Sequence, residues 1–357
     1  MNKLVLPDFY EDELFFSWLA RVEVRNMFFS YSDTARCMFG NPKTRVSFEF
    51  INALTPEFVG QVERKKSIED IIQNHTMFPY YSCFWSEERK AKAYDALRLM
   101  QSKRENALTL PLPKDGQKKM YYCPVCAKNE RSRFGECYWH RAHQIDGVFV
   151  CHKHECRLVS SDVVITTRKK YELIPAEFHI PAKLPVPKRG TDKEILLAQY
   201  LYDLLSCSTS ATTGNLADFL HFRMNGTKYL NRRGSFIKAK VLYEDYLEYW
   251  GKDAAITNAR AMKELCNGNR VNTYTIAQVA IMVGIPAEDL IKLEVTDLPV
   301  WEQFDKEVAR LNETGIGYLD IAQAMDASPH LIEACLKRQG LKRNRIKKEY
   351  RPRKKAV

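Results

Sequence analysis

Two short cysteine and histidine pairs, with twenty-four residues between them, constrain the fold of this chain more than any other feature. Cys123 and Cys126 are two residues apart, and so are Cys151 and His154. A two-residue gap lets one tight turn present two ligands to one ion, and zinc takes four such ligands in a tetrahedron. The spacing therefore predicts one structural Zn²⁺ ion on these four side chains, with no position open to water.

Other cysteine and histidine residues near this cluster leave alternatives open. The spare candidates are Cys137, His140, His143, His152 and Cys156. Cys137, His140 and His143 recur at every third residue, so a helix would bring them near one face. They could bind a second metal, or serve as packing and outer-shell groups of the first. Structural disulfides would need an oxidising compartment, to which the sequence shows no route.

The residues around these pairs resemble a known family. The runs FGECYWHRAHQ (134–144) and GVFVCHKH (147–154) are similar to the zinc-finger core of the TniQ/TnsD family, the target-site selectors of bacterial transposons. The resemblance extends roughly over residues 5–160, although Cys137 replaces the small or apolar residue expected there. It continues more faintly over 223–250, where the pattern is closer to TnsD. Upstream, the same family resemblance includes Leu6-Pro7, Asp12-Glu13-Leu14, Trp18-Leu19-Ala20-Arg21 and His75-Thr76-Met77-Phe78-Pro79.

The N-terminal part has the apolar periodicity of packed helices. Phe15, Leu19 and Val22 define one apolar helical face, and a second helix is expected to end at Gly40. The two could form a helix-turn-helix or a plain pair of packed helices. The resemblance implies that this part binds a protein, namely an AAA+ regulator like TnsC, which in turn recruits the transposase.

The positive charge of the chain is concentrated at one end. The formal net charge is +11, and residues 331–357 contain eleven Lys and Arg against two acidic residues. A basic end on a nearly neutral body indicates a local polyanion contact, or else a solvated tail. The N-terminus does not resemble a signal peptide, and no apolar run approaches the length of a membrane span. The sequence thus predicts a cytoplasmic, nucleoid-associated protein without a membrane partner.

At 357 residues, the chain is expected to be mainly α, multi-domain, with a small zinc-ribbon or zinc-finger module and tandem helix-turn-helix units. The expected parts are an N-terminal helical domain (1–118), the zinc-finger module (119–160), a strand and proline-rich linker (161–190), a helical DNA-contact domain (191–255), and a tandem helix-turn-helix with a basic end (256–357).

Two stretches of the last part have the layout of a helix-turn-helix. The first spans 275–294, but its second helix has Glu288, Asp289 and Glu294 against one lysine, so a structural role is expected. The second spans 319–338 and leads into the basic end, so it is the expected DNA reader. Candidate base contacts are His330, Glu333, Ala334 and Lys337, and Arg338 is a further DNA-contact candidate on the same helix. Candidate phosphate contacts are Lys228, Arg232, Arg233, Lys238, Lys240, Lys342, Arg343, Arg345, Lys347 and Lys348.

Taken together, the residues predict a zinc-containing protein that binds double-stranded DNA and is not an enzyme. The resemblance further implies a selector that binds an attachment site and recruits the AAA+ regulator and the transposase. Three alternatives remain open. They are a family member joined to a guide-RNA effector complex, a metal-dependent nuclease using His152 and His154, and a transcriptional regulator with a zinc module.

Overall fold

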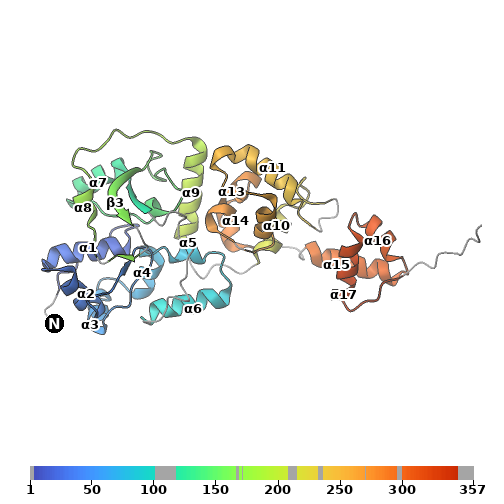
Figure 1. Ribbon diagram of the computed structural model, residues 1–357, viewed down its shortest axis with the longest axis horizontal. Helices are drawn as coiled ribbons and strands as arrows, with labels where there is room; N and C mark the ends of the chain where they lie inside the picture. The colour runs from blue at the N-terminus through green and yellow to red at the C-terminus, as the bar shows by residue number, and fades with distance from the viewer. Residues whose placement is uncertain are drawn as a thin grey trace, which may run out of the picture. The chain divides into compact units, whose positions relative to one another are not determined.

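The chain divides into two compact units. The first comprises residues 1–212, 272–281 and 286–291, and the second comprises 213–271, 282–285 and 292–357. The computed structural model describes residues 4–100, 118–165, 169–170, 172–207, 215–231, 236–269, 271–295 and 300–344. The secondary structure is mainly helical with few short strands, so the predicted fold class is confirmed at that level (Figure 1).

The first unit begins with six helices and one short strand. They are α1 (Phe15–Asn26), α2 (Tyr31–Phe39), β1 (Val46–Ser47), α3 (Pro56–Val62), α4 (Ile68–His75), α5 (Phe78–Ser82) and α6 (Glu87–Arg98). The unit continues with β2 (Lys118–Tyr122), α7 (Pro124–Phe134), the 3-10 turn η1 (Ala142–Gln144), β3 (Val159–Ile165), β4 (Lys169–Lys170), α8 (Ala176–His179) and α9 (Asp192–Ser206).

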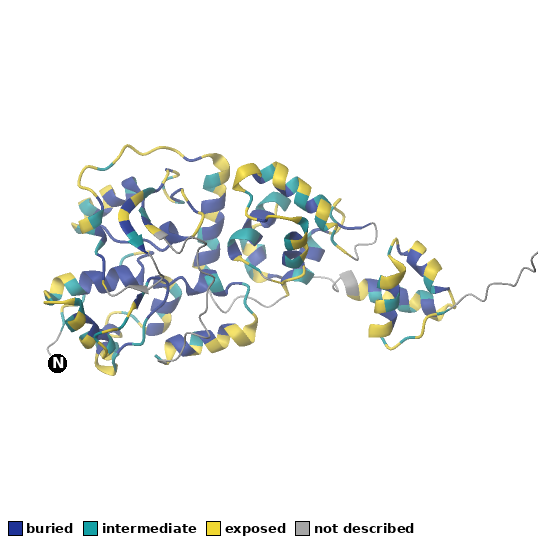
Figure 2. Cartoon of the chain, in the orientation of Figure 1, coloured by how far each residue is buried: buried dark blue, intermediate teal, exposed yellow. Residues whose placement is uncertain are grey.

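Local sequence signals set the ends of α1 and α2. Phe15, Leu19 and Val22 are fully buried along one face of α1, as their spacing predicts. Ser30 caps the start of α2 by accepting a hydrogen bond from the Asp33 amide, and Gly40 ends it in the left-handed conformation. The buried faces of these helices turn toward the interior of the unit (Figure 2).

Two antiparallel strand pairs tie distant segments of the first unit together. In β2 and β3, Tyr121 pairs with Ser160 and Tyr122 pairs with Val159. In β1 and β4, Val46 pairs with Lys170. Because Cys123 directly follows β2 and β3 follows the second cysteine-histidine pair, the β2–β3 pairing brings both pairs to the same end of the ladder.

Helix α9 packs against the segment that contains the second cysteine-histidine pair. A capping box starts it, with Thr191 and Glu194 each accepting a hydrogen bond from the other's backbone amide. Glu194 also binds Arg157 at 2.8 Å, and the ring of Tyr202 stacks on His152 with centroids 3.7 Å apart. The segment that follows residue 158 is therefore packed against the cysteine-rich part of the chain.

Residues 272–281 pack on the first unit through their N-terminal end. The Thr273 hydroxyl donates a 2.7 Å hydrogen bond to the Tyr80 carbonyl, and the Tyr274 ring lies against Gly147. Gly147 has φ +88°, and a Cβ atom there would lie 2.6 Å from the Tyr274 ring. This position therefore favours glycine for its backbone conformation, and a side chain there would also displace the outer end of the half-buried Tyr274 ring.

Substitution at this contact gives a first testable prediction. Gly147→Ala should lower the free energy of unfolding by about 2–4 kcal/mol, because a left-handed alanine costs about 1–2 kcal/mol and overpacking adds about 1–3. Gly135→Ala is the matched control, since Gly135 has φ +79° and a Cβ atom there would meet nothing within 4 Å. Chemical denaturation measures both. Equal losses would show that the Tyr274 contact does not exist in solution.

The second unit is helical in its described part. Its helices are α10 (Leu216–Arg223), α11 (Ala239–Trp250), the 3-10 turn η2 (Gly251–Asp253), α12 (Ala259–Cys266), α15 (Val300–Glu313), α16 (Tyr318–Ala324) and α17 (Pro329–Arg338). The helices α13 (Thr273–Val283) and α14 (Ala287–Lys292) follow α12 in the chain. Along α11, Tyr246 is fully buried, whereas Tyr243 and Tyr249 are half-buried.

A small core holds α15, α16 and α17 together. Its central members are Phe304, Val308, Ile321, Ile332 and Leu336, all buried. The turn between α16 and α17 passes through Asp326 at φ +49°, in the left-handed region. Across the described residues, we find no helix whose length and hydropathy would let it span a membrane.

Candidate functional site

The first half of the candidate metal centre is the start of α7. Cys123 is the N-cap residue, and its sulfur accepts a hydrogen bond from the Cys126 amide at 3.4 Å. Pro124 occupies the first helical position, where its missing N–H costs nothing. One turn of helix thus places both sulfurs on the same side.

The second half is a closed loop between residues 151 and 156. The Cys151 amide donates to the Cys156 carbonyl and the Glu155 amide donates to the Cys151 carbonyl, each at 2.8 Å. Glu155 has φ +53°, which turns the chain back on itself. This loop points Cys151 and His154 toward α7, while His152 stacks on Tyr202 instead.

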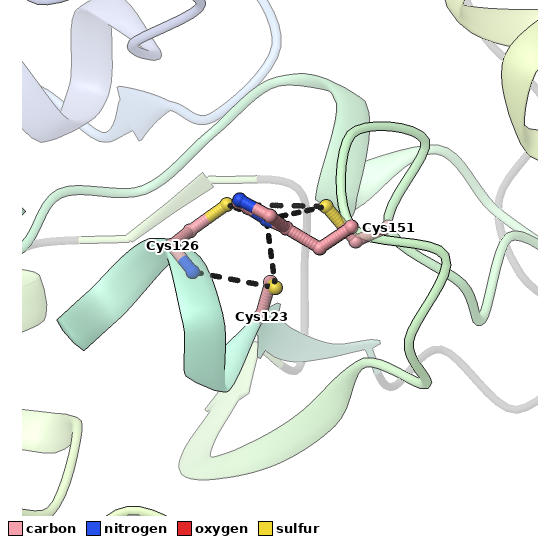
Figure 3. A group of neighbouring side chains, drawn as sticks. Cys123, Cys126 and Cys151 are labelled. Atoms are coloured by element: carbon pink, nitrogen blue, oxygen red, sulfur yellow. Dashed lines mark hydrogen bonds between the residues drawn. The ribbon is translucent and has the colours of Figure 1, made fainter. Parts of the chain in front are cut away.

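The four predicted ligand side chains converge, and Figure 3 labels the three cysteines among them. Their ligand atoms all lie within 4.8 Å of one another. The Nδ1 atom of His154 lies 3.5 Å from the sulfur of Cys123, 3.3 Å from that of Cys126 and 3.6 Å from that of Cys151. The sulfurs of Cys126 and Cys151 are 3.9 Å apart.

These distances match the spacing of four ligand atoms around one tetrahedrally coordinated ion. Metal–sulfur bonds of about 2.3 Å and metal–nitrogen bonds of about 2.0 Å give tetrahedral edges of roughly 3.8 Å between sulfurs and roughly 3.5 Å between sulfur and nitrogen. The cluster therefore could hold a metal ion without rearrangement, and all three cysteines are buried.

The thiols also compete for protons. Hydrogen bonds with Cys123 and Cys151 raise the pKa of Cys126, whereas hydrogen bonds from Cys123 and Cys126 lower the pKa of Cys151. One thiolate in the cluster is thus favoured at the expense of its neighbours. A divalent cation would relieve this competition, because it stabilises all three thiolates at once.

The spare cysteine and histidine residues do not form the helical face that their spacing suggested. Gly135 ends α7 in the left-handed conformation, so residues 137–140 lie outside any helix and Arg141 leads into the 3-10 turn η1. The Cys137 thiol donates to the Ala127 carbonyl at 3.4 Å. His143 Nε2 lies 4.0 Å from the Cys126 sulfur, and Cys156 lies beside Cys123.

His140 belongs to a buried polar network that includes Asp12 of the N-terminal segment and Glu130 of α7. Its Nε2 lies 2.6 Å from Glu130, and its Nδ1 lies 3.5 Å from Asp12. Burial alone would lower the pKa of His140, but these two carboxylates raise it to about 9. Although Cys126, Glu130 and His140 lie close enough to share an ion, the short contact between Glu130 and His140 already satisfies both side chains.

Arg141 extends this network to the N-terminal segment. Its guanidinium binds Asp12 at 3.1 Å and donates to the carbonyls of Gln73 and Thr76. Burial alone would raise the pKa of Asp12, but the hydrogen bond from His140 and the charge of Arg141 hold it below its ordinary value. Arg141 is 3% exposed, so this is a desolvated ion pair.

A second buried set of ion pairs lies nearby, centred on Arg21 of α1. Arg21 binds Glu13 at 2.8 Å and Glu136 at 2.9 Å. Burial raises the pKa of Glu13 to about 7 despite this partner. The pairings of Arg21 with Glu136 and of Asp12 with Arg141 could not be predicted from the sequence, because the partners lie far apart in the chain. The available signal was the presence of charged residues inside otherwise apolar motifs.

The candidate DNA-contact residues lie in the second unit, apart from those outside the described residues. The latter are Arg232, Arg233, Arg345, Lys347 and Lys348. Of the described ones, Lys228 pairs with Asp245 at 2.6 Å, Lys240 lies 3.9 Å from Glu244, and Lys238 is exposed at the start of α11.

Two of the candidates on α17 are held by internal ion pairs. Arg338 binds Asp305 of α15 at 2.7 Å, and Glu333 pairs with Arg343. His330 and Lys337 are exposed on α17, and Lys342 is exposed just beyond it. His330 and Lys337 are seven residues apart, so they share one face of the helix.

The fold and the site together define a mainly helical protein built around a Cys3His cluster that could hold a metal ion. Residues 4–158 match the family model of TniQ. The transposon Tn7 transposition protein TnsD of Escherichia coli is 25% identical over 207 residues, which cover 55% of this chain and 39% of that protein. The chain thus spans about two fifths of the length of this relative.

Residues 4–158 are therefore similar to the TniQ family, and 207 residues of the chain are similar to TnsD. The resemblance drawn from the sequence motifs is confirmed. The matched residues contain all four side chains of the metal cluster and both buried ion pairs.

Proposed function

We propose that this protein is a target-site selector of a bacterial transposon. In this proposal its C-terminal region binds a specific duplex DNA site, and its TniQ-like region recruits other transposition proteins, including an AAA+ regulator and, through it, the transposase. The similarity to TnsD, a transposition protein by name, carries the proposal.

The cluster of Cys123, Cys126, Cys151 and His154 supports a structural rather than a catalytic metal. We propose that it holds one Zn²⁺ ion, since three thiolates and one imidazole suit zinc. Four protein ligands leave no coordination position for water or substrate, which favours an adaptor over a nuclease. The ion would then stabilise the fold that presents the recruiting surface.

The helix pair of α16 and α17 supports the DNA-binding half of the proposal. A second helix that enters the major groove presents one exposed face to base edges. On α17 that face contains His330 and Lys337, both exposed, whereas Glu333 and Arg338 are engaged within the unit. We therefore propose His330 and Lys337 as base contacts and Lys342 as a phosphate contact.

DNA binding by matched variants tests this division. Duplexes selected from random genomic fragments would be compared with scrambled versions at several salt concentrations. Lys337→Ala should cost about 1–3 kcal/mol on the selected duplex and little on the scrambled one. Lys342→Ala should weaken both and reduce the salt slope by about one.

Arg310→Ala is the charge-matched control, because Arg310 lies on α15 and is held by Glu307 through two 2.8 Å hydrogen bonds. It should change neither affinity by more than a few tenths of a kcal/mol, on the order of a surface ion pair. Failure of the wild-type protein to enrich any sequence would overturn the proposed function. Equal losses on both duplexes for Lys337→Ala would remove α17 as the reading helix.

A further inference from the structure

Cys156 brings a fourth sulfur to the candidate metal centre. Its Sγ lies 3.4 Å from the Sγ of Cys123, a shorter separation than the 3.9 Å between Cys126 and Cys151. The Cys156 side chain is buried, and Cys123 has no exposed surface. The two sulfurs therefore meet in a site from which bulk water is excluded.

The backbone on both sides of Cys156 fixes this position. The Cys156 carbonyl accepts from the Cys151 amide at 2.8 Å, and the Arg157 amide donates to the Lys188 carbonyl at 2.7 Å. The backbone of Cys156 also forms an isolated antiparallel β-bridge with that of Arg189. The Cys156 sulfur is thus placed by the same closed loop that delivers Cys151 and His154.

The chemistry of a buried thiolate gives this sulfur a role. A metal-bound thiolate keeps negative charge, and a buried charge without hydrogen-bond donors is costly. Cys123 receives one donor, the Cys126 amide at 3.4 Å. The Cys156 thiol lies 3.4 Å away and would supply a second if its proton points at Cys123. It is not needed as a ligand, since Cys123, Cys126, Cys151 and His154 already complete a tetrahedron.

We propose that Cys156 is a positioning residue of the metal centre, whose thiol donates a hydrogen bond to the Cys123 thiolate and raises the affinity for the ion. This inference rests on the metal assignment made under the proposed function. Hydrogen-bond partners of metal ligands typically change affinity by 10–100-fold when removed, so the effect should be measurable.

The experiment uses the full chain loaded with Co²⁺, whose thiolate charge-transfer band reports the electron density on the sulfurs. Cys156→Ala should bind the metal about 10–100-fold more weakly in chelator competition. Its charge-transfer band should move to longer wavelength, because a thiolate without that donor gives up an electron more easily. Cys156→Ser, which keeps a donor at this position, should restore most of both properties.

Cys137→Ala is the matched control. Cys137 is equally buried in the same segment, but its thiol donates to the Ala127 carbonyl rather than to a ligand sulfur. This variant should leave the band where it is in the wild type.

Each other outcome overturns the inference in a distinguishable way. A wild-type protein that takes up no cobalt overturns the metal assignment itself, and this inference with it. A wild-type cobalt spectrum typical of four thiolate ligands would make Cys156 a metal ligand. It would refute its role as a hydrogen-bond donor to Cys123. If Cys156→Ala matches the wild type in affinity and band position, or if Cys156→Ser is shifted as far as Cys156→Ala, the hydrogen bond is refuted while the metal assignment stands.

Discussion

Purified Cys126→Ser is expected to contain no zinc and to lose the cooperative unfolding transition of the first unit. Zinc binding by Cys3His modules is worth on the order of 10 kcal/mol, and a whole domain is stable by about 5–15 kcal/mol. A serine hydroxyl is a poor replacement for a thiolate ligand, so most of that binding energy should disappear. Metal analysis and thermal unfolding followed by circular dichroism measure the two effects.

The loss should spread beyond the cysteine loops. The Leu14 amide donates to the Trp139 carbonyl at 2.9 Å, and the Arg141 amide donates to the Asp12 carbonyl at 2.8 Å. Amide protons of α1 should therefore lose protection from hydrogen exchange in the same variant. Cys266→Ser, at a fully buried cysteine of α12 in the second unit, is the control and should keep its zinc. A Cys126→Ser protein with one full equivalent of zinc would refute the ligand assignment.

Arg141→Met is expected to destabilise the metal-loaded protein by about 3–5 kcal/mol, because it leaves the buried Asp12 and Glu130 carboxylates with His140 as their shared cationic partner. Asp12 and Arg141 are 5% and 3% exposed, so solvent cannot replace the lost contact. The carbonyls of Gln73 and Thr76 would lose a donor as well. Urea denaturation at constant zinc measures the change.

The control for this variant is an ion pair at the surface. Arg36 binds Asp33 at 3.1 Å, but the two side chains are 62% and 44% exposed. Arg36→Met should therefore cost between zero and about 1 kcal/mol. The double variant Asp12→Leu with Arg141→Met should be less destabilised than Arg141→Met alone, since it buries no unpaired charge. Similar losses for Arg141→Met and Arg36→Met would mean that the buried network contributes little.

The features that the sequence predicts best are those encoded within a few residues. The two-residue gaps nominate four side chains that the fold does bring together, because each gap is resolved by one local turn. The Ser30 cap and the Gly40 end of α2 are equally local. The motif resemblance locates the part of the chain that matches the TniQ family model, since residues 134–154 are distinctive in kind and order.

What the sequence does not reveal depends on contacts between distant segments. Nothing in the spacing pairs Asp12 with Arg141, or Arg21 with Glu136, because only the folded chain brings them together. The same holds for α17, where Glu333 is paired with Arg343 rather than directed at a base. The regular spacing of Cys137, His140 and His143 suggested a helix, but Gly135 ends α7 before it reaches them.

The contacts of helix α9 limit where recombination within the coding sequence can leave a folded protein. The residues that match the family model end at Leu158, yet Tyr202 stacks on His152 and Glu194 binds Arg157. A recombination event that moved only the matched segment into another gene would leave the cysteine loop without these contacts. Exchanges that leave a working protein should therefore have their crossover points beyond α9, so the heritable block is longer than the recognisable one.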